Sequence, residues 1–169
     1  PRPFGGAPSP APAPAPADGR FTWPPGGANI FLPFPWFNCY CGDIDLIGQP
    51  KPQWFYRSVL WGTSPVEIAV QRPVPDKQAE VLSWWGWSDE LRSWTWPGRE
   101  GLPMKVRVYT TGDEVALLLN GREVASKPVP AEARLMVDFD VPYAPGELKA
   151  VARRGGQIIG ERVLTTVGV

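Results

Sequence analysis

Residues 106–127, VRVYTTGDEVALLLNGREVASK, decide the fold of this chain. Two runs of β-branched and apolar residues, 105–110 and 114–119, are separated by a Gly-Asp turn signal. Asn120 and Gly121 then stand between LLL and REVAS, and both residue types tolerate the positive φ that a two-residue hairpin requires. The stretch therefore predicts consecutive antiparallel strands joined by tight turns.

The same pattern extends on both sides of this stretch. Further strand-like runs lie at 66–71, 135–141, 148–152 and 158–166, and Pro-Gly and Gly-Gly turn signals separate the later ones. About seven short strands over roughly 100 residues are typical of an immunoglobulin-like antiparallel β-sandwich. We assign residues 63–169 to such a domain, and because it holds no cysteine it would lack the disulfide of antibody domains.

The chain before residue 63 has a different character. Residues 21–62 are dense in aromatic side chains, and apolar residues at helical spacing predict one short amphipathic helix over 53–61. Pro52 suits the first turn of that helix, and Gly62 ends it. Residues 1–20 alternate proline with small residues, so we expect a Pro/Ala-rich linker; the alternative is a ligand for an SH3-type domain.

Composition and charge exclude several classes of function. Lys plus Arg and Asp plus Glu both total 17, so there is no basic excess to hold a phosphate backbone, and we expect no nucleic-acid partner. No apolar run reaches the length of a membrane span. The absence of histidine removes Ser-His-Asp and Cys-His catalysis, and Cys39 and Cys41 alone do not make a zinc site. We expect no metal and no cofactor.

A cluster of tryptophans is the clearest candidate for a binding surface. Five indoles lie within thirteen residues: Trp84, Trp85, Trp87, Trp94 and Trp96. An indole face can stack on the C–H face of a sugar ring, but tryptophan is also the largest core residue and packs well at a domain seam. The cluster therefore predicts sugar stacking or domain-seam packing. By contrast, we interpret the paired Asp43 and Asp45 as closing a loop before the helix.

Several motifs, taken in order, resemble glycoside hydrolase family 2, the family that contains bacterial β-galactosidases. Residues 41–62, CGDIDLIGQPKPQWFYRSVLWG, look like the last βα unit of that family's catalytic (β/α)8 barrel, with Asp45, Gly48 and Lys51 at the matching places. The WTWPG at 94–98, the stretch 106–127 and VPYAPGELKAVA at 141–152 are similar to the immunoglobulin-like domain that follows the barrel. The resemblance covers about residues 34–169.

The resemblance implies a fold and a function for the parent enzyme. It implies a mainly β chain, in which a loop and one helix left over from the barrel (21–62) precede the sandwich (63–169). It also implies retaining hydrolysis of a β-linked sugar by two glutamates, as in β-galactosidases. No glutamate of this chain follows an asparagine or lies in a barrel-like context, so we assign no catalytic residue and predict that the isolated chain is inactive.

We therefore expect the C-terminal part of a β-galactosidase-like glycoside hydrolase, whose partner is the catalytic barrel of the same enzyme. Loops that follow barrel strands lie at the catalytic face, so Trp36 and Asn38 are the candidates for contact with a β-galactoside-type carbohydrate. Two alternatives stay open: a carbohydrate-binding module that uses the tryptophan cluster, and an immunoglobulin-like interaction module. The sequence names neither the sugar nor the compartment.

Overall fold

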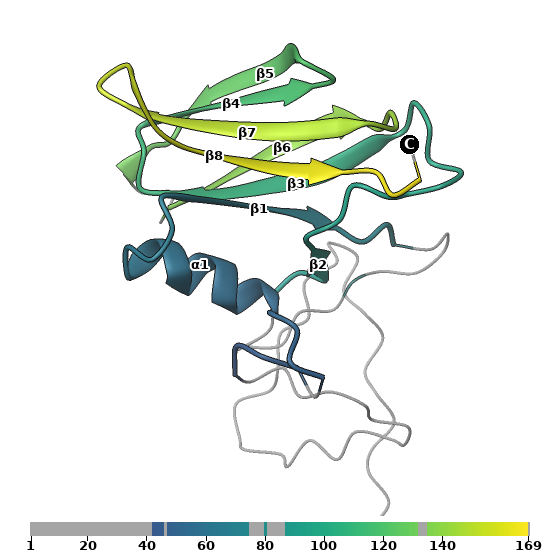
Figure 1. Ribbon diagram of the computed structural model, residues 1–169, viewed down its shortest axis with the longest axis horizontal. Coiled ribbons are helices and arrows are strands. Elements are labelled where there is room, and N and C mark those ends of the chain that lie inside the picture. The colour runs from purple at the N-terminus through teal and green to yellow at the C-terminus, as the bar shows by residue number, and fades with distance from the viewer. Residues whose placement is uncertain (1–41, 46, 75–79, 81–86, 132–134, 169) are drawn as a thin grey trace, which may run out of the picture.

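Two four-stranded antiparallel sheets pack face to face in the computed structural model, and one helix lies against them (Figure 1). The structure describes residues 42–45, 47–74, 80, 87–131 and 135–168. The first sheet has the strand order β2-β1-β3-β6 and the second the order β5-β4-β7-β8. The elements are α1 (Pro52–Leu60), β1 (Val66–Gln71), β2 (Glu90–Leu91), β3 (Pro103–Thr110), β4 (Glu114–Leu119), β5 (Arg122–Pro128), β6 (Met136–Pro142), β7 (Glu147–Arg154) and β8 (Gln157–Thr165).

The path of the chain through the two sheets is that of an immunoglobulin-like sandwich. The chain changes sheet between β3 and β4, between β5 and β6, and between β6 and β7, so that β3 pairs with β6 and β4 pairs with β7. Strands that are neighbours in space but not in sequence are the mark of this Greek-key arrangement. The predicted mainly β fold is confirmed.

The hairpin between β4 and β5 forms where the Asn-Gly pair predicted it. Asn120 and Gly121 have φ values of 52° and 79°, and Leu119 pairs with Arg122 across the turn. Two consecutive positive φ values give a turn whose twist matches that of the flanking strands. The register of β4 against β5 shifts once, between Leu117 and Leu118.

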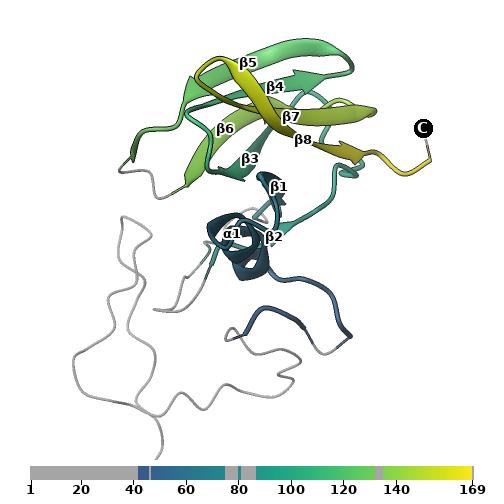
Figure 2. The ribbon, with the colours of Figure 1, turned by 60° about the vertical axis from the view of Figure 1, so that its left-hand side comes forward.

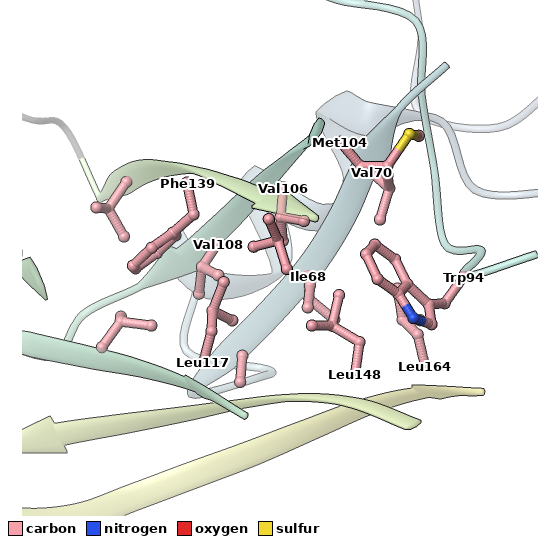
Figure 3. Close-up of a cluster of buried hydrophobic side chains, with 14 of the residues drawn as sticks. Ile68, Val70, Trp94, Met104, Val106, Val108, Leu117, Phe139, Leu148 and Leu164 are labelled. Carbon is pink, nitrogen blue, oxygen red and sulfur yellow. The ribbon is translucent and has the colours of Figure 1, made fainter. Parts of the chain in front are cut away.

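The hydrophobic core lies between the two sheets and is built from alternate strand residues (Figure 3). Successive side chains of a strand point to opposite faces, so every second residue of β1 and β3 turns inward to meet β4 and β7. All of the residues labelled in Figure 3 belong to this cluster: Ile68, Val70, Trp94, Met104, Val106, Val108, Leu117, Phe139, Leu148 and Leu164.

Helix α1 lies on the outer face of the first sheet, next to β1 (Figures 1 and 2). It begins at Pro52, whose missing N–H costs nothing in the first turn, and the preceding Lys51 has an extended backbone. Gly62, with a φ of 72°, ends the helix, since its N–H donates to the Val59 carbonyl. The helix predicted over residues 53–61 is confirmed to within one residue at each end.

The remaining predictions about the chain's organisation divide into three groups. The strands predicted at 66–71 and 114–119 coincide with β1 and β4, whereas the two-residue β2 was not predicted. The linker at 1–20, and Cys39 and Cys41, lie outside the described residues. Among the residues that are described, no helix has the length and apolar character that crossing a bilayer requires.

Candidate functional site

Helix α1 is fixed to the first sheet by an apolar contact on the sheet's outer face. Phe55 and Val59 are almost fully buried and pack against Ala69 of β1 and Tyr109 of β3. We call this layer the helix interface; its partly buried members are Trp54, Tyr56, Trp87, Leu135 and Met136. The interface is separate from the core, because Ala69 and Tyr109 alternate with the inward-facing residues of their strands.

Three aromatic rings meet at one side of the helix interface. The Trp87 ring centroid lies 5.2 Å from that of Tyr56 and 6.1 Å from that of Tyr109. Tyr56 and Tyr109 are 6.3 Å apart in an edge-to-face arrangement. These separations fall in the range in which aromatic pairs attract each other. Trp87 therefore joins the segment before β2 to both the helix and the sheet.

A buried carboxylate lies beside these rings. Glu90 of β2 is 3% exposed, and its Oε2 accepts a 2.5 Å hydrogen bond from the Tyr109 hydroxyl. Its Oε1 accepts a 2.7 Å bond from Arg107, which also donates to both carboxylate oxygens of Asp138 at 2.6 and 2.8 Å. The three strands β2, β3 and β6 are thereby joined on the outer face of the first sheet.

The acid–base properties of this group reflect its burial. Loss of solvent raises the pKa of Glu90 above its usual value, although Arg107 and the Tyr109 hydroxyl act in the opposite direction. Burial also raises the pKa of Tyr109, and the neighbouring Glu90 adds to this effect. The hydrogen bonds to Asp138 raise the pKa of Arg107. Tyr109 and Arg107 are therefore protonated throughout the physiological range, and both donate to Glu90.

A second buried carboxylate, Glu67, lies on the same face of β1. It is 1% exposed, and its Oε1 accepts a 2.6 Å hydrogen bond from Arg162 of β8. Arg92 approaches its other oxygen to 3.6 Å and also lies 5.5 Å from the centre of the Phe55 ring. Glu67 therefore links the two sheets through Arg162, and links the helix interface to the segment after β2 through Arg92.

The loop that leads into α1 is closed by its aspartates. The Asp45 carboxylate accepts hydrogen bonds from the backbone N–H groups of Ile47 and Gln49, at 2.9 and 2.8 Å. Asp43 forms an ion pair with Arg57 of α1. Both carboxylates thus hold the loop against the start of the helix, as the sequence indicated, and neither is directed toward the other as an acid–base pair.

The structure separates the tryptophans that the sequence grouped together. Trp94 is 0% exposed in the sandwich core, where its Nε1 donates to the Ala144 carbonyl and its ring meets that of Tyr143 at 5.1 Å. It therefore has no free face for a sugar and does not lie at a domain seam, so core packing describes its place. Trp96 is half-buried against the same core, and Trp87 lies at the helix interface.

Four of the predicted site residues cannot be placed. Trp36 and Asn38, proposed for sugar contact, and Trp84 and Trp85 lie outside the described residues. Within the described part of the chain, no group of three or more His, Cys, Asp or Glu side chains could hold a metal ion. The charged groups of the helix interface were not singled out from sequence, because isolated charges on alternating strand residues look like an ordinary solvated face.

The chemistry of the described site is that of attachment. Its two buried glutamates, Glu67 and Glu90, are each held by arginine side chains, and Glu90 also by Tyr109. These contacts use the carboxylates to fix strands and helix to one another. The aromatic rings that accompany them face the sheet and the helix instead of an open cleft.

Comparisons with known proteins place this arrangement among relatives. A family model described as "Domain of unknown function (DUF4982)" matches residues 101–160, from the turn before β3 into β8. A curated relative, the β-galactosidase BoGH2A of Bacteroides ovatus, is 26% identical over 141 residues, which make up 80% of this chain and 14% of that protein.

Solved structures give the same picture. A glycosyl hydrolase family 2 member from Bacteroides cellulosilyticus is 35% identical, with a TM-score of 0.66, over 76% of this chain and 17% of that one. A β-glycosidase from Bacteroides vulgatus is 28% identical, with a TM-score of 0.55, over 76% of this chain and 14% of that one. The chain thus spans between 14% and 17% of the length of these relatives.

Proposed function

Because this chain is related to glycoside hydrolase family 2 enzymes over most of its length, we propose that it is an accessory, non-catalytic part of a β-galactosidase-like glycoside hydrolase. Its sandwich carries α1 and the loop before it, and these connect the sandwich to the catalytic barrel of the same enzyme. The glutamates that hydrolyse the glycosidic bond lie elsewhere in that enzyme.

The observation that carries this proposal is the way in which α1 is held. Its inner side is locked to β1 and β3 by Phe55 and Val59, so the helix moves with the sandwich. Beyond that inner side, Leu60 at the end of the helix and Trp61 after it are 52% and 69% exposed, and Ile47 in the preceding loop is 81% exposed. Exposed apolar residues at both ends of a firmly held helix suit a surface that contacts another domain.

The chemistry of the buried carboxylates supports a non-catalytic role. Retaining glycosidases need two carboxyl groups about 5 Å apart that flank the scissile bond, one of them free to attack the sugar. Glu67 and Glu90, the two buried glutamates, are instead engaged by Arg162 and Arg107 on the outer face of the first sheet. Freed from those contacts, either would leave strands of the sandwich unattached.

An assay of hydrolysis tests the proposal directly. The purified 169-residue chain is incubated with an aryl β-galactoside, with the intact β-galactosidase of Bacteroides ovatus as positive control and buffer as blank. We expect turnover by the relative and none by this chain above the blank. Turnover by this chain that persists through further purification would overturn the proposal.

The alternative functions predict a different result in a binding experiment. A carbohydrate-binding module would be retarded in a native gel that contains a galactoside polymer, and the retardation would depend on its exposed tryptophans. The structure weakens this alternative, because Trp94 is enclosed in the core and Trp87 packs on Tyr56 and Tyr109. An immunoglobulin-like interaction module would not need the helix interface for its stability.

A further inference from the structure

The turn between β4 and β5 contains a chemically sensitive pair of residues. Asparagine occurs at positions 29, 38 and 120, and only Asn120 is followed by glycine. Both Asn120 and Gly121 are exposed to solvent in the hairpin. An asparagine followed by glycine is prone to cyclise, because glycine has no side chain to hinder approach of its backbone nitrogen to the asparagine amide.

The amide of Asn120 is held at both of its polar atoms. Its Oδ1 accepts a 2.8 Å hydrogen bond from the Glu147 backbone N–H, and its Nδ2 donates a 3.0 Å bond to the Pro145 carbonyl. The Asn120 backbone N–H also donates to the Glu147 carbonyl, at 2.8 Å. The side chain of the β4–β5 turn thus anchors the turn that joins β6 to β7.

The β6–β7 turn is shaped to receive this amide. Gly146 has a φ of 128°, and a Cβ atom added there would lie 1.9 Å from the Asn120 Oδ1. Such a distance is far inside the contact limit, and the obstacle includes the amide carbon and nitrogen at 2.7 and 2.9 Å. The glycine therefore makes room for the asparagine, and any larger residue would displace it.

Cyclisation is possible only when these contacts open. The Gly121 backbone nitrogen, after losing its proton to hydroxide, bonds to the Asn120 Cγ, and the Cγ–Nδ2 bond breaks to release ammonia. Water then opens the resulting succinimide at either carbonyl and leaves aspartate or isoaspartate. No oxidant or reductant is needed. In the folded chain the leaving nitrogen and the carbonyl oxygen of the amide are both engaged by the neighbouring turn.

We propose that Asn120 is a modification site whose conversion to aspartate or isoaspartate is suppressed by the β6–β7 turn and proceeds when that turn separates from the β4–β5 hairpin. The modification records local opening of the sandwich irreversibly. Its products also prevent reclosure. Aspartate has no N–H to donate to Pro145, and isoaspartate adds a methylene group to the backbone between β4 and β5.

The first test compares folded and denatured chain. The full 169-residue protein is incubated in mildly alkaline buffer with and without denaturing urea, and the peptide that contains Asn120 is followed by mass spectrometry and by its isoaspartate content. Since two hydrogen bonds must open before cyclisation, we expect conversion in the folded chain to be about ten- to a hundredfold slower. Equal rates in the two states would overturn the proposal.

A pair of glycine variants tests whether the contact itself is responsible. Gly146→Ala forces the Asn120 amide out of its place, whereas Gly156→Ala, in the β7–β8 turn at a φ of 79°, adds a similar backbone strain with nothing within 4 Å of the new Cβ. We expect faster conversion of Asn120 in Gly146→Ala than in Gly156→Ala, with circular dichroism confirming that both are folded. Equal rates in the two folded variants would overturn the proposal.

A third measurement serves if Gly146→Ala does not fold. Conversion of Asn120 in the unaltered chain is measured at several urea concentrations below the unfolding transition, together with hydrogen exchange of the Glu147 amide, which donates to Asn120. We expect the two rates to rise together. A conversion rate that stays constant while the Glu147 amide exchanges faster would contradict control by this turn.

Discussion

The core of the sandwich and the helix interface lie on opposite faces of the same sheet, yet they are built from different chemistry. The inner face of β1 and β3 presents only apolar residues to the second sheet. The outer face presents Ala69 and Tyr109 to α1, and beside them Glu67, Glu90 and Arg107. Both faces are buried, but only the outer one buries charge.

This difference teaches what each face is for. Apolar contacts are non-directional, so they hold two layers together without fixing their relative position closely. A buried ion pair is costly unless its geometry is good, and it contributes little net stability, but it is satisfied in only one arrangement. Our hypothesis is that the core supplies stability, while the charges around α1 fix where the helix lies. Three substitutions probe this comparison.

The largest effect is expected from the core. Trp94→Ala removes a fully buried indole and its hydrogen bond to the Ala144 carbonyl, so it leaves a large cavity beside Tyr143. We expect the free energy of unfolding to fall by about 4 kcal/mol, as for other buried aromatic residues replaced by alanine. Urea denaturation followed by tryptophan fluorescence measures the change.

Trp61→Ala is the matched control for this substitution. Trp61 is 69% exposed after the end of α1, so the same change there should alter the free energy of unfolding by less than about 0.5 kcal/mol. If both variants were equally stable, Trp94 would not be the core residue that the structure shows.

The sandwich could be predicted from sequence because its signals are local. Alternation in 114–119 and the Asn-Gly pair at 120–121 fix two strands and their turn before any long-range contact is known. The helix was equally accessible, from apolar spacing between Pro52 and Gly62. The two-residue β2 carries no periodicity at all, so nothing in the sequence marks it.

The candidate site was less accessible for a physical reason. The tryptophans within 84–96 are neighbours in sequence, but Trp87 and Trp94 lie in different layers, and only the tertiary fold sends one to the helix interface and the other to the core. Likewise, the pairing of Glu90 with Arg107 and Tyr109 spans 17 and 19 residues. Sequence shows each charge separately and not its partner.

The second prediction concerns the apolar part of the helix interface. Phe55→Ala removes the buried ring that packs on Ala69 and Tyr109. We expect a loss of about 3 kcal/mol, at the lower end for a buried phenylalanine, because half-buried neighbours on one side of the helix can relax into the space. Leu60→Ala, on the same helix at 52% exposure, is the control and should cost less than about 1 kcal/mol.

The outcome for Phe55 decides whether α1 folds with the sandwich. A loss of stability in a single cooperative transition means that the helix and the sheets unfold together. If Phe55→Ala left the unfolding of the sheets unchanged and affected only the helical signal, α1 would be an independent segment, and the helix interface would not anchor it.

The smallest effect, and the one that depends on pH, is expected from the buried charges. Arg107→Leu leaves Glu90 without its cationic partner in a buried site. Removing a partner of a fully buried pair costs about 3 to 5 kcal/mol, but Arg107 is itself one-fifth exposed and Glu90 can take up a proton. We therefore expect a loss of about 2 kcal/mol at neutral pH, measured by urea denaturation.

The pH dependence follows from the direction of the Glu90 pKa. Burial raises this pKa above 4.5, so the folded chain binds the proton more readily than the unfolded chain. The unfavourable contribution of Glu90 is therefore absent below the unfolded pKa and grows as the pH rises through the folded pKa. Arg107 lowers the Glu90 pKa, so its removal raises that pKa further and makes the variant's deficit grow from acid toward neutral pH.

Two controls separate this effect from a general loss of charge. Arg72→Leu breaks the exposed pair with Asp89, whose side chains are 55% and 59% exposed, and should cost less than about 1 kcal/mol with little dependence on pH. Adding Glu90→Gln to Arg107→Leu removes the titrating group, so the deficit should become independent of pH in this range. A deficit that kept its pH dependence without Glu90 would place its origin in another carboxylate, such as Asp138, and the charged half of the comparison would then rest on the exposed edge of the sheet instead of its buried centre.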